Sequence, residues 1–551
     1  MRVAADGQRV LVVNGRLADT PENHAFDELD ELLLDCARRG ISALDGLRGS
    51  YGLCLIDIPQ NLIVVQRDAL GGRTACVAFG EERILAASHA QALARHPACG
   101  FHEAPGYLAA RLSHAGFPLA GQSPFAGIDA LLPGERRCWQ DGRERTEHRP
   151  IAVPSSFQDP GEQQVLQQFR ERLENAICNG LRGRQCVASM LSGGLDSAPA
   201  TALARKIGQQ SGCKVLPVSW HLDGRPGDER GWIEAVATHL GVDAEFFDGN
   251  DCIPYARLDK EQINPDWMEY NPFRDLLEGC IGRGQAAGAD TVMNATAGDF
   301  IYPQFNHLLP GLLANGDWGR AMRLVGRRAG QWWRWRKMPW RDPAMRFFLR
   351  RLLSKREHRL HAPSRFRQTY LAASLRGQAP FRIPVYPDSI LRHPVPEYPA
   401  FALGQAFAFN RACESWFAEC RGLHYFDPYQ DQALMELMLG LPFHYSYRNG
   451  QSKWLMRETS RGLIPESVRT KQRTGDLFPL LLHGYRRHRA QARERLMDCR
   501  GWQALCDVAL MDRVLAEGRP SEGELVLVNQ LLGYVLWREY WSDPPPLAQA
   551  N

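Results

Sequence analysis

The sequence predicts an α+β domain over residues 1–150 and, over 160–551, an α/β domain with a parallel sheet and a helical carboxy-terminal part. A chain of 551 residues is too long for one ordinary domain. Short apolar runs broken by Gly, Asn, Asp and Pro fill the first part, whereas strand and helix patterns alternate after residue 160. The Pro- and Ser-rich stretch 149–161 between them is typical of a linker.

The elements of the first domain follow from its hydrophobic pattern. Three runs rich in Val, Ile, Leu and Tyr predict strands at 9–14, 51–57 and 61–68. Between the first two, HAFDELDELLLDCARRG (24–40) repeats apolar residues at helical spacing and predicts an amphipathic helix.

The second domain begins with a strong helix pattern at 162–181, followed by a buried strand at 185–191. A glycine turn then opens a helix over 192–208, and the alternation continues with segments at 214–222, 228–241, 242–248 and 290–299. Such alternation predicts a parallel sheet built from right-handed crossovers. Beyond about residue 310 the pattern is mostly helical.

Composition excludes several classes of protein. With 44% hydrophobic and 23% charged residues, the chain has the make-up of a soluble globular protein. It has no apolar run near the roughly 18 to 20 residues of a membrane-spanning helix, and no secretory signal at its start. The 14 cysteines are scattered without a C-x-x-C pair, which argues against a zinc site or a disulfide framework. We therefore expect reduced thiols in a cytoplasmic enzyme.

The charge is unevenly distributed. Residues 317–367 hold 16 Lys or Arg against 3 Asp or Glu, a local net charge of +13, together with five tryptophans. Such a segment can bind nucleic acid, an anionic membrane surface or an acidic polypeptide. It can equally be a solvated helical face whose tryptophans pack inward, and this second interpretation is slightly favoured. No nucleic-acid motif accompanies it, so we expect no nucleic-acid function.

A candidate phosphate site follows the strand that ends at Leu191. Its hexapeptide SGGLDS (192–197) lies where parallel sheets bind ligands, and its glycines let backbone N–H groups approach an anion. Serine hydroxyls and the positive helix end add donors. Asp196 would repel a bare phosphate, which suggests that Mg²⁺ lies between them; the alternative is a plain turn with an acidic N-cap. The candidate nucleotide-binding residues are Leu191, Ser192, Gly193, Gly194, Leu195, Asp196 and Ser197.

This hexapeptide is the signature of enzymes that cleave ATP between the α and β phosphates, and with the rest of the chain it resembles the asparagine synthetase superfamily. That group includes asparagine synthetases, β-lactam synthetases and lasso peptide cyclases. The amino-terminal motifs VVNGRL, LDGLRGSYGLCLID, QRDALGG and LAASHAQAL resemble a class II glutamine amidotransferase domain, and DPYQD, KWLMR and GLIPESV resemble carboxy-terminal synthetase motifs. The resemblance implies an Ntn-type sandwich, then an adenine-nucleotide α-hydrolase-like domain that uses ATP and Mg²⁺.

The amino terminus departs from the amidotransferase pattern, which needs a nucleophilic cysteine directly after the initiator Met. Arg2 occupies that position, and the nearest cysteine, Cys36, lies in a predicted helix. The chain also begins close to its Asn14-Gly15 motif, so we expect the first strands of the domain to be missing. Glutamine-dependent synthesis is therefore not expected, and the domain is interpreted as a structural relic recruited to hold a substrate.

The second departure is the loop NATAGD (294–299). Where asparagine synthetases carry an acidic residue and β-lactam synthetases a tyrosine, this chain has Thr296. The following Gly298, Asp299 and FIYPQ resemble lasso cyclases more closely. The resemblance places Asp299 beside Asp196 as a second magnesium ligand; the alternative is an Asx turn. Thr296 cannot act as a general base at neutral pH, which favours a peptide α-amine, with a pKa near 8, as the acceptor.

The third site is VRTKQRTG (468–475), where the family shows an Arg, a gap residue and a Lys that stabilises negative charge in acyl transfer. Counted without gaps from Val468, Lys471 falls on the family's Arg and Arg473 on its Lys, unless a short indel shifts the alignment. Both offset charge on phosphate or oxyanion, unless they are surface cations on a loop.

The remaining candidates carry weaker signals. The resemblance puts the adenine base against Val218, Ser219 and Leu222. Asp228 and Glu229 open the next helix and fit the role of capping charges as well as that of site residues. Lys453 and Arg457, four apart on one helical face, can be structural, and a core role is the default for His424 and Tyr425.

The sequence thus predicts an enzyme that forms amides through an acyl-adenylate and releases AMP and pyrophosphate. The favoured subfamily, the lasso peptide cyclase, joins the amino-terminal amine of a precursor peptide to an Asp or Glu side chain. A leader-peptide-binding protein and a cysteine protease are the expected pathway partners. The alternatives are a β-lactam synthetase-type cyclase, an ammonia-dependent asparagine synthetase and a catalytically inactive peptide-binding scaffold.

Overall fold

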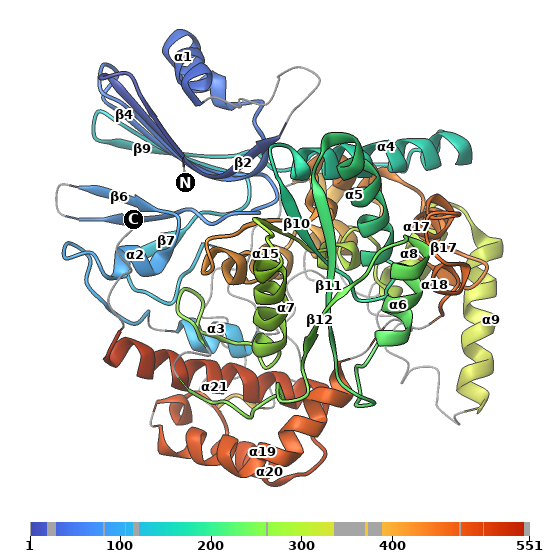
Figure 1. Cartoon of the computed structure of the whole chain (residues 1–551). Helices are drawn as coiled ribbons and strands as arrows, with labels where there is room; N and C mark the ends of the chain where they lie inside the picture. Colours follow the sequence, from blue (N-terminus) through green and yellow to red (C-terminus); the bar gives the residue numbers. More distant parts are fainter. Residues whose placement is uncertain are drawn as a thin grey trace.

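The computed structural model describes residues 2–18, 29–80, 83–104, 106–113, 121–259, 263–334, 370–372, 388–472, 475, 477–499 and 501–544. Two antiparallel sheets occupy the first 150 residues, and a parallel sheet flanked by helices forms the centre of the rest (Figure 1). None of the helices in the described ranges is both long and apolar enough to cross a membrane.

The larger amino-terminal sheet has the strand order β1-β2-β3-β4-β8-β9, with every neighbouring pair antiparallel. Its strands are β1 (Arg2–Ala5), β2 (Arg9–Ala18), β3 (Arg48–Asp57), β4 (Leu62–Arg67), β8 (Glu135–Gln140) and β9 (Arg143–His148). Helix α1 (Leu29–Arg39) covers one face, because Leu32, Leu33 and Cys36 pack against alternate residues of β2 and β3. The predicted strands of this domain are confirmed, and the amphipathic helix predicted over 24–40 is confirmed at Leu29–Arg39; residues 24–28 lie outside the described part of the chain.

The smaller sheet has the order β6-β5-β7, formed by β5 (Cys76–Phe79), β6 (Ile84–Ala87) and β7 (Ile128–Ala130). Together with the short helices α2 (Ala90–Ala94) and α3 (Tyr107–Ser113), it faces the carboxy-terminal helix α21 (Glu522–Ser542). One buried cluster contains residues from both sides, among them Phe125 and Trp537, whose rings lie 5.5 Å apart. The first 150 residues therefore share a hydrophobic core with the end of the chain.

The predicted parallel sheet is present, with the strand order β12-β11-β10-β15-β16. Its strands are β10 (Cys186–Met190), β11 (Lys214–His221), β12 (Glu245–Asp248), β15 (Thr291–Met293) and β16 (His424–Phe426). Successive side chains enter opposite layers: Val187 packs toward α4 (Glu162–Leu181) and α5 (Ser197–Ser211), while Ala188 packs toward α7 (Arg274–Ala286). Helix α6 (Arg230–His239) crosses from β11 to β12, and α15 (Gln405–Glu419) packs beside α7.

Helices make up most of the remaining described chain, as predicted. They are α8 (Phe305–Ala314), α9 (Trp318–Arg334), α13 (Asp388–Arg392), α14 (Glu397–Ala402), α16 (Gln432–Gly440), α17 (Trp454–Thr459), α18 (Glu466–Arg469), α19 (Phe478–Asp498), α20 (Val508–Ala516) and α21. In the stretch 149–161, which has neither helix nor strand, Ile151 and Val153 are buried in the main core.

The basic segment is helical where it is described, as α9. Ala321 and Leu324 are buried, but 65% of Trp318 is exposed, so the expectation that the tryptophans pack inward is wrong for this residue. Residues 335–367, including Trp335 and Trp340, and the side chains of Trp332 and Trp333 lie outside the described part of the molecule.

Candidate active site

The loop between β10 and α5 brings backbone and hydroxyl donors to one point. Gly193 has φ +63°, and a Cβ there would lie 2.7 Å from the Cβ of Trp232, so the tight turn requires glycine. The backbone N–H of Ser192 donates to Ser197 Oγ at 3.1 Å, and the two hydroxyls lie 3.0 Å apart. Leu191 and Leu195 are buried in the core, so they anchor the loop and offer a ligand only their backbone.

Asp196 occupies the N-cap position of α5 without capping it. Its side chain accepts no hydrogen bond from the first turn, so the alternative of a plain acidic N-cap is wrong. One carboxylate oxygen contacts the ammonium group of Lys453, and the other, Oδ1, has no hydrogen-bond partner among the described residues although it is buried. Burial raises the pKa of Asp196 against the effect of Lys453, and the nearby Asp299 raises it further.

The loop after β15 meets the phosphate loop directly. Gly298 lies so close that a Cβ would stand 2.7 Å from Cγ of Asp196. Asp299 follows, and its Oδ1 lies 2.6 Å from Lys453 Nζ, while two thirds of its side chain remains exposed. The structure thus brings together the two carboxylates that the sequence paired, although they are about a hundred residues apart.

Lys453 is the residue on which both carboxylates converge. It lies just before α17 with φ +53°, in the left-handed region that few non-glycine residues adopt. Burial lowers its pKa, but Asp196 and Asp299 outweigh burial and leave the pKa above its usual value. Lys453 is therefore more than structural, whereas Arg457 has the structural role expected of it, because it donates to the carbonyls of Arg469 and Lys471 at 2.5 and 3.0 Å.

Lys471 lies on the other side of the phosphate loop. Its Nζ is 2.6 Å from Glu229 Oε1 and 4.6 Å from the ring centre of Trp232, the residue that packs on Gly193. Only 12% of its side chain is exposed, so the surface-cation alternative is wrong for Lys471. Glu229 does not cap α6 with its side chain but pairs with this lysine. Arg473 lies outside the described residues.

Arg469, Thr470 and Lys471 follow one another in the order Arg, gap residue, Lys that the family motif shows. The guanidinium of Arg469 is almost fully buried and lies 2.6 Å from Glu466 and 3.3 Å from Glu458. These contacts and the bond from Arg457 to its carbonyl fix the segment that presents Lys471.

Val218, Ser219 and Leu222 lie at the carboxyl end of β11, next to the phosphate loop. The Leu191 N–H donates to the Val218 carbonyl at 2.9 Å, which ties the two strand ends together. All three side chains are buried, and Leu222 packs against Leu276 and Leu480. A nucleotide base at this place would therefore meet their backbone.

A half-buried carboxylate that sequence reasoning missed lies beside the NATAGD loop. Glu414, on α15, accepts hydrogen bonds from the Tyr425 hydroxyl at 2.7 Å and the Asn294 amide at 3.1 Å, and the exposed Thr296 donates to it as well. Burial raises the pKa of Glu414 to about 7, against these three donors. Tyr425 therefore contacts a titratable group and is more than a core residue. No local motif marks Glu414 as a site residue, because its partner Thr296 lies over a hundred residues away in the sequence.

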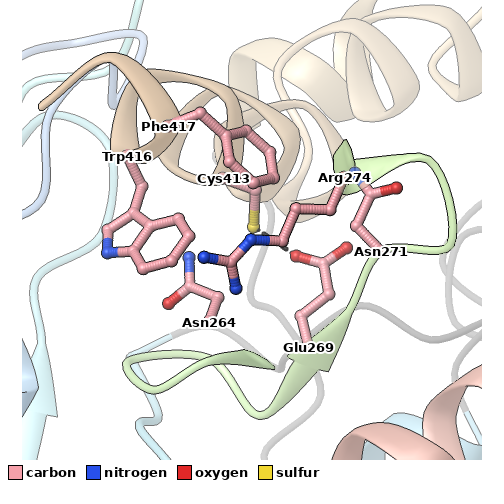
Figure 2. A pocket seen from close by; sticks show the side chains of 7 residues that line it. All are labelled: Asn264, Glu269, Asn271, Arg274, Cys413, Trp416 and Phe417. Carbon is pink, nitrogen blue, oxygen red and sulfur yellow. Dashed lines mark hydrogen bonds between the residues drawn. The ribbon is translucent and has the colours of Figure 1, made fainter. Parts of the chain in front are cut away.

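A second carboxyl group, Glu269, lies near Glu414. Figure 2 shows Glu269 beside Cys413, whose thiol donates to it, and Arg274, whose guanidinium lies 5.0 Å from the ring centre of Trp416. Burial raises the pKa of Glu269, and its proximity contributes to the raised pKa of Glu414. The cavity between these side chains is about 10 Å³, enough for roughly one water molecule.

The arrangement offers three chemical elements in one region. A donor-rich loop at a helix N-terminus suits phosphates, two converging carboxylates suit a divalent cation, and a carboxylate with a pKa near neutrality suits proton transfer. The orphaned Oδ1 of Asp196 fits a metal ligand, since it is buried and makes no hydrogen bond within the described chain.

About half of the chain is similar in sequence to known proteins. The "Amidase chyE" of Penicillium rubens is 24% identical over 275 residues, and the "Amidase chry2" of Gibberella zeae is 24% identical over 315 residues. These alignments cover 46% and 51% of this chain, and 38% and 44% of those proteins. The "Asparagine synthetase [glutamine-hydrolyzing]" of Brassica oleracea is 27% identical over 270 residues, 45% of this chain and 41% of that protein. The chain thus spans less than half the length of these relatives.

Among solved structures, a glutamine phosphoribosylpyrophosphate amidotransferase from B. subtilis, complexed with ADP and GMP, covers 53% of this chain and 62% of its own. Its TM-score of 0.19 and 13% identity are too low to support any argument. The glutamine amidotransferase domain matches residues 4–149, as expected for the amino-terminal sheets. Asparagine synthase matches residues 168–259 and 319–533, more than half of the sequence and nearly all of the described site outside the NATAGD loop. The chain therefore belongs to the asparagine synthase family.

Proposed function

We propose that the protein is an ATP- and Mg²⁺-dependent synthetase that forms an amide bond through an acyl-adenylate. A substrate carboxylate attacks the α-phosphorus of ATP and releases pyrophosphate, and an amine then displaces AMP. The convergence of Asp196 and Asp299 on Lys453, beside the SGGLDS loop, carries this proposal. Lys471 adds a second cation across the loop, near the place where the leaving pyrophosphate gains charge.

The chain's own groups would divide the work of the first step. Backbone N–H groups of the loop and the positive end of α5 hold the phosphates, and Lys453 and Lys471 offset their charge. Asp196 and Asp299 are the residues that would hold Mg²⁺, which when bound supplies charge neutralisation for the pyrophosphate. Val218, Ser219 and Leu222 would line the base through their backbone.

In the second step we assign proton transfer to Glu414. Thr296 is exposed above it and donates to it, so an amine held at Thr296 would stand one hydrogen bond from the carboxylate. A base with a pKa of about 7 is half ionised at neutral pH, where general-base catalysis is most effective. Thr296 then orients the base and the amine without ionising itself.

For the substrate we propose a precursor peptide whose amino-terminal amine closes on an Asp or Glu side chain, as in lasso peptide cyclases. The loop NATAGDFIYPQ supports this choice. Holding both groups on one folded peptide makes the reaction intramolecular, which raises the effective concentration of the amine. A leader-peptide-binding protein and a cysteine protease remain predicted partners.

The products of the wild-type protein test the reaction class. Incubation with ATP, Mg²⁺ and the precursor peptide is expected to give AMP and pyrophosphate in equal amounts, and a peptide lighter by one water. Ion chromatography and mass spectrometry measure both. ADP and phosphate as products would contradict adenylation, while AMP from aspartate and ammonia would favour asparagine synthesis over cyclisation.

Glutamine is expected not to serve as a nitrogen donor. Burial raises the pKa of Cys36, the thiol nearest the start of the described chain, to about 12, so this thiol is not ionised at neutral pH. Glutamate release from glutamine should stay at the level of a protein-free blank. Thiol-alkylating glutamine analogues should leave amide formation unchanged, and inhibition by them would mean that another thiol acts as nucleophile.

A further inference from the structure

A second cavity lies outside the candidate active site, between the amino-terminal sheet and the parallel-sheet domain. It has a volume of about 710 Å³, within the range of roughly 300 to 1,000 Å³ typical of sites for drug-sized ligands. Asn14 and Ser50, from β2 and β3, form one wall, and Asn179 and Arg184, from the end of α4 and the turn after it, form another. The segment from His424 to Asp431 closes it.

This segment separates the cavity from the candidate active site. Asp427 accepts a hydrogen bond from the Ala297 N–H at 2.8 Å, and the Tyr429 hydroxyl donates to the Asp196 carbonyl at 2.8 Å. The opposite side of the same segment lines the cavity, where Arg73 donates to the Tyr425 carbonyl at 3.4 Å. The cavity is therefore a distinct space that shares one wall with the site.

Positive charge predominates around the cavity. Five arginines line it: Arg2, Arg16, Arg73, Arg182 and Arg184. Three carboxylates also line it, but each is already engaged. Glu419 pairs with Arg73, Asp427 accepts backbone N–H groups, and Asp431 caps α16 through Leu434 N–H at 2.9 Å. The lining thus has more cations than carboxylates available to neutralise them.

Several buried donors in the lining lack acceptors. Arg73 Nε, Arg184 Nε and Gln430 Nε2 are buried and have no hydrogen-bond partner among the described residues. Burial lowers the pKa of Arg184, Asp290 raises it, and the positive charge of Arg2 lowers it further. The guanidinium groups of Arg184 and Arg2, which come from different domains, therefore repel one another. Buried donors without acceptors cost free energy. A negatively charged acceptor brought by a ligand would satisfy these donors and reduce the repulsion between the two guanidinium groups.

We propose that this cavity binds a carboxylate-bearing ligand of amino-acid to short-peptide size, with Arg184, Arg2 and Gln430 as its donors. Guanidinium groups match carboxylates through paired N–H donors. The volume exceeds the needs of a simple ion, and Leu423, Phe426 and Ala176 give the wall an apolar part that suits an organic body. The proposal does not depend on the reaction of the neighbouring site, because it concerns binding alone.

Calorimetry on the full chain without ATP tests it. The probe Glu-Glu-Glu is expected to bind with saturable heat, at least about tenfold more tightly than Gln-Gln-Gln. Arg184→Gln should weaken Glu-Glu-Glu binding by about tenfold or more, since a charge-assisted hydrogen bond is worth roughly 1.5 to 3 kcal/mol. Arg2→Gln, at the start of the edge strand β1, is a second variant that should weaken binding even if Arg184→Gln does not fold.

The matched control is Arg143→Gln, an exposed arginine on β9, at the opposite edge of the same sheet. This variant should bind Glu-Glu-Glu as the wild type does. The proposal is overturned if Glu-Glu-Glu gives no saturable heat, or if Arg143→Gln weakens binding as much as the cavity variants do. Inorganic phosphate that binds as tightly as Glu-Glu-Glu would also overturn it, because the cavity would then select charge without an organic body.

Discussion

Replacing Asp196 by Ala is expected to abolish formation of AMP and pyrophosphate, a loss of at least about a thousandfold in rate. Asp196 is the buried member of the carboxylate pair, and its Oδ1 has no other partner in the described structure. Its removal leaves Lys453 with Asp299 alone, and leaves a bound triphosphate without the ligand that would bring a cation to it. ATP–pyrophosphate exchange with the peptide substrate measures the effect.

The fold of this variant should survive, because Asp299 still pairs with Lys453 and no buried charge is left without a partner. Circular dichroism should match the wild type. Asp243→Ala, an exposed aspartate before β12, is the matched control and should exchange at the wild-type rate. Exchange by a folded Asp196→Ala protein within tenfold of the wild type would show that this carboxylate has no part in adenylation.

The Glu414→Gln variant is expected to separate the two halves of the reaction. Amide formation should fall by about 10² to 10⁴, the usual contribution of a general base, while ATP–pyrophosphate exchange stays near the wild-type rate. Glutamine keeps the size of the side chain and one acceptor for Tyr425 and Asn294, so the site keeps its shape. If both rates fall together, Glu414 supports the structure of the site and is not its base.

The pH dependence gives a second measure of Glu414. Its pKa of about 7 predicts that the wild-type rate of amide formation rises through pH 7 as the carboxylate ionises, and that Glu414→Gln lacks this limb. Tyr425→Phe removes a donor that lowers the pKa, so the limb should move to higher pH. The pKa of Glu414 is higher in the folded protein than in the unfolded chain, so its ionisation lowers the free energy of unfolding of the wild type as pH rises through 7. The free energy of unfolding of Glu414→Gln should not fall in this way.

Sequence motifs predicted the parts of the site that are local. SGGLDS follows a buried strand and opens a helix, so its glycines and serines could be assigned from neighbouring residues alone. The position of Asp299 beside Asp196 came from the resemblance, and the close approach at Gly298 explains it physically. The helices and the antiparallel strands followed from their periodicity because each has one face in a core, and the central strand β10 followed from its continuous apolar run because both of its faces are buried.

The residues that were missed or misassigned owe their roles to partners far along the chain. Glu229 and Asp196 look like capping charges in sequence, but lysines more than two hundred residues away pair with them. Lys453 lies on no helical face, since its backbone turns left-handed just before α17. Glu414 is one of two glutamates in α15 and belongs to no motif, and only the fold brings Thr296, Asn294 and Tyr425 to it.

The buried cluster that contains Phe125 and Trp537 joins the first 150 residues to the end of the chain. The ring of Phe101 stacks on that of Trp541 at 5.0 Å, and Arg111 donates to the carbonyls of Trp267 and Met268. Both ring contacts and hydrogen bonds therefore connect the first 150 residues with the rest of the chain. Deleting the amino-terminal part would expose the aromatic side chains of α21 to water. The parallel-sheet domain is therefore expected to depend on the amino-terminal part for its own stability.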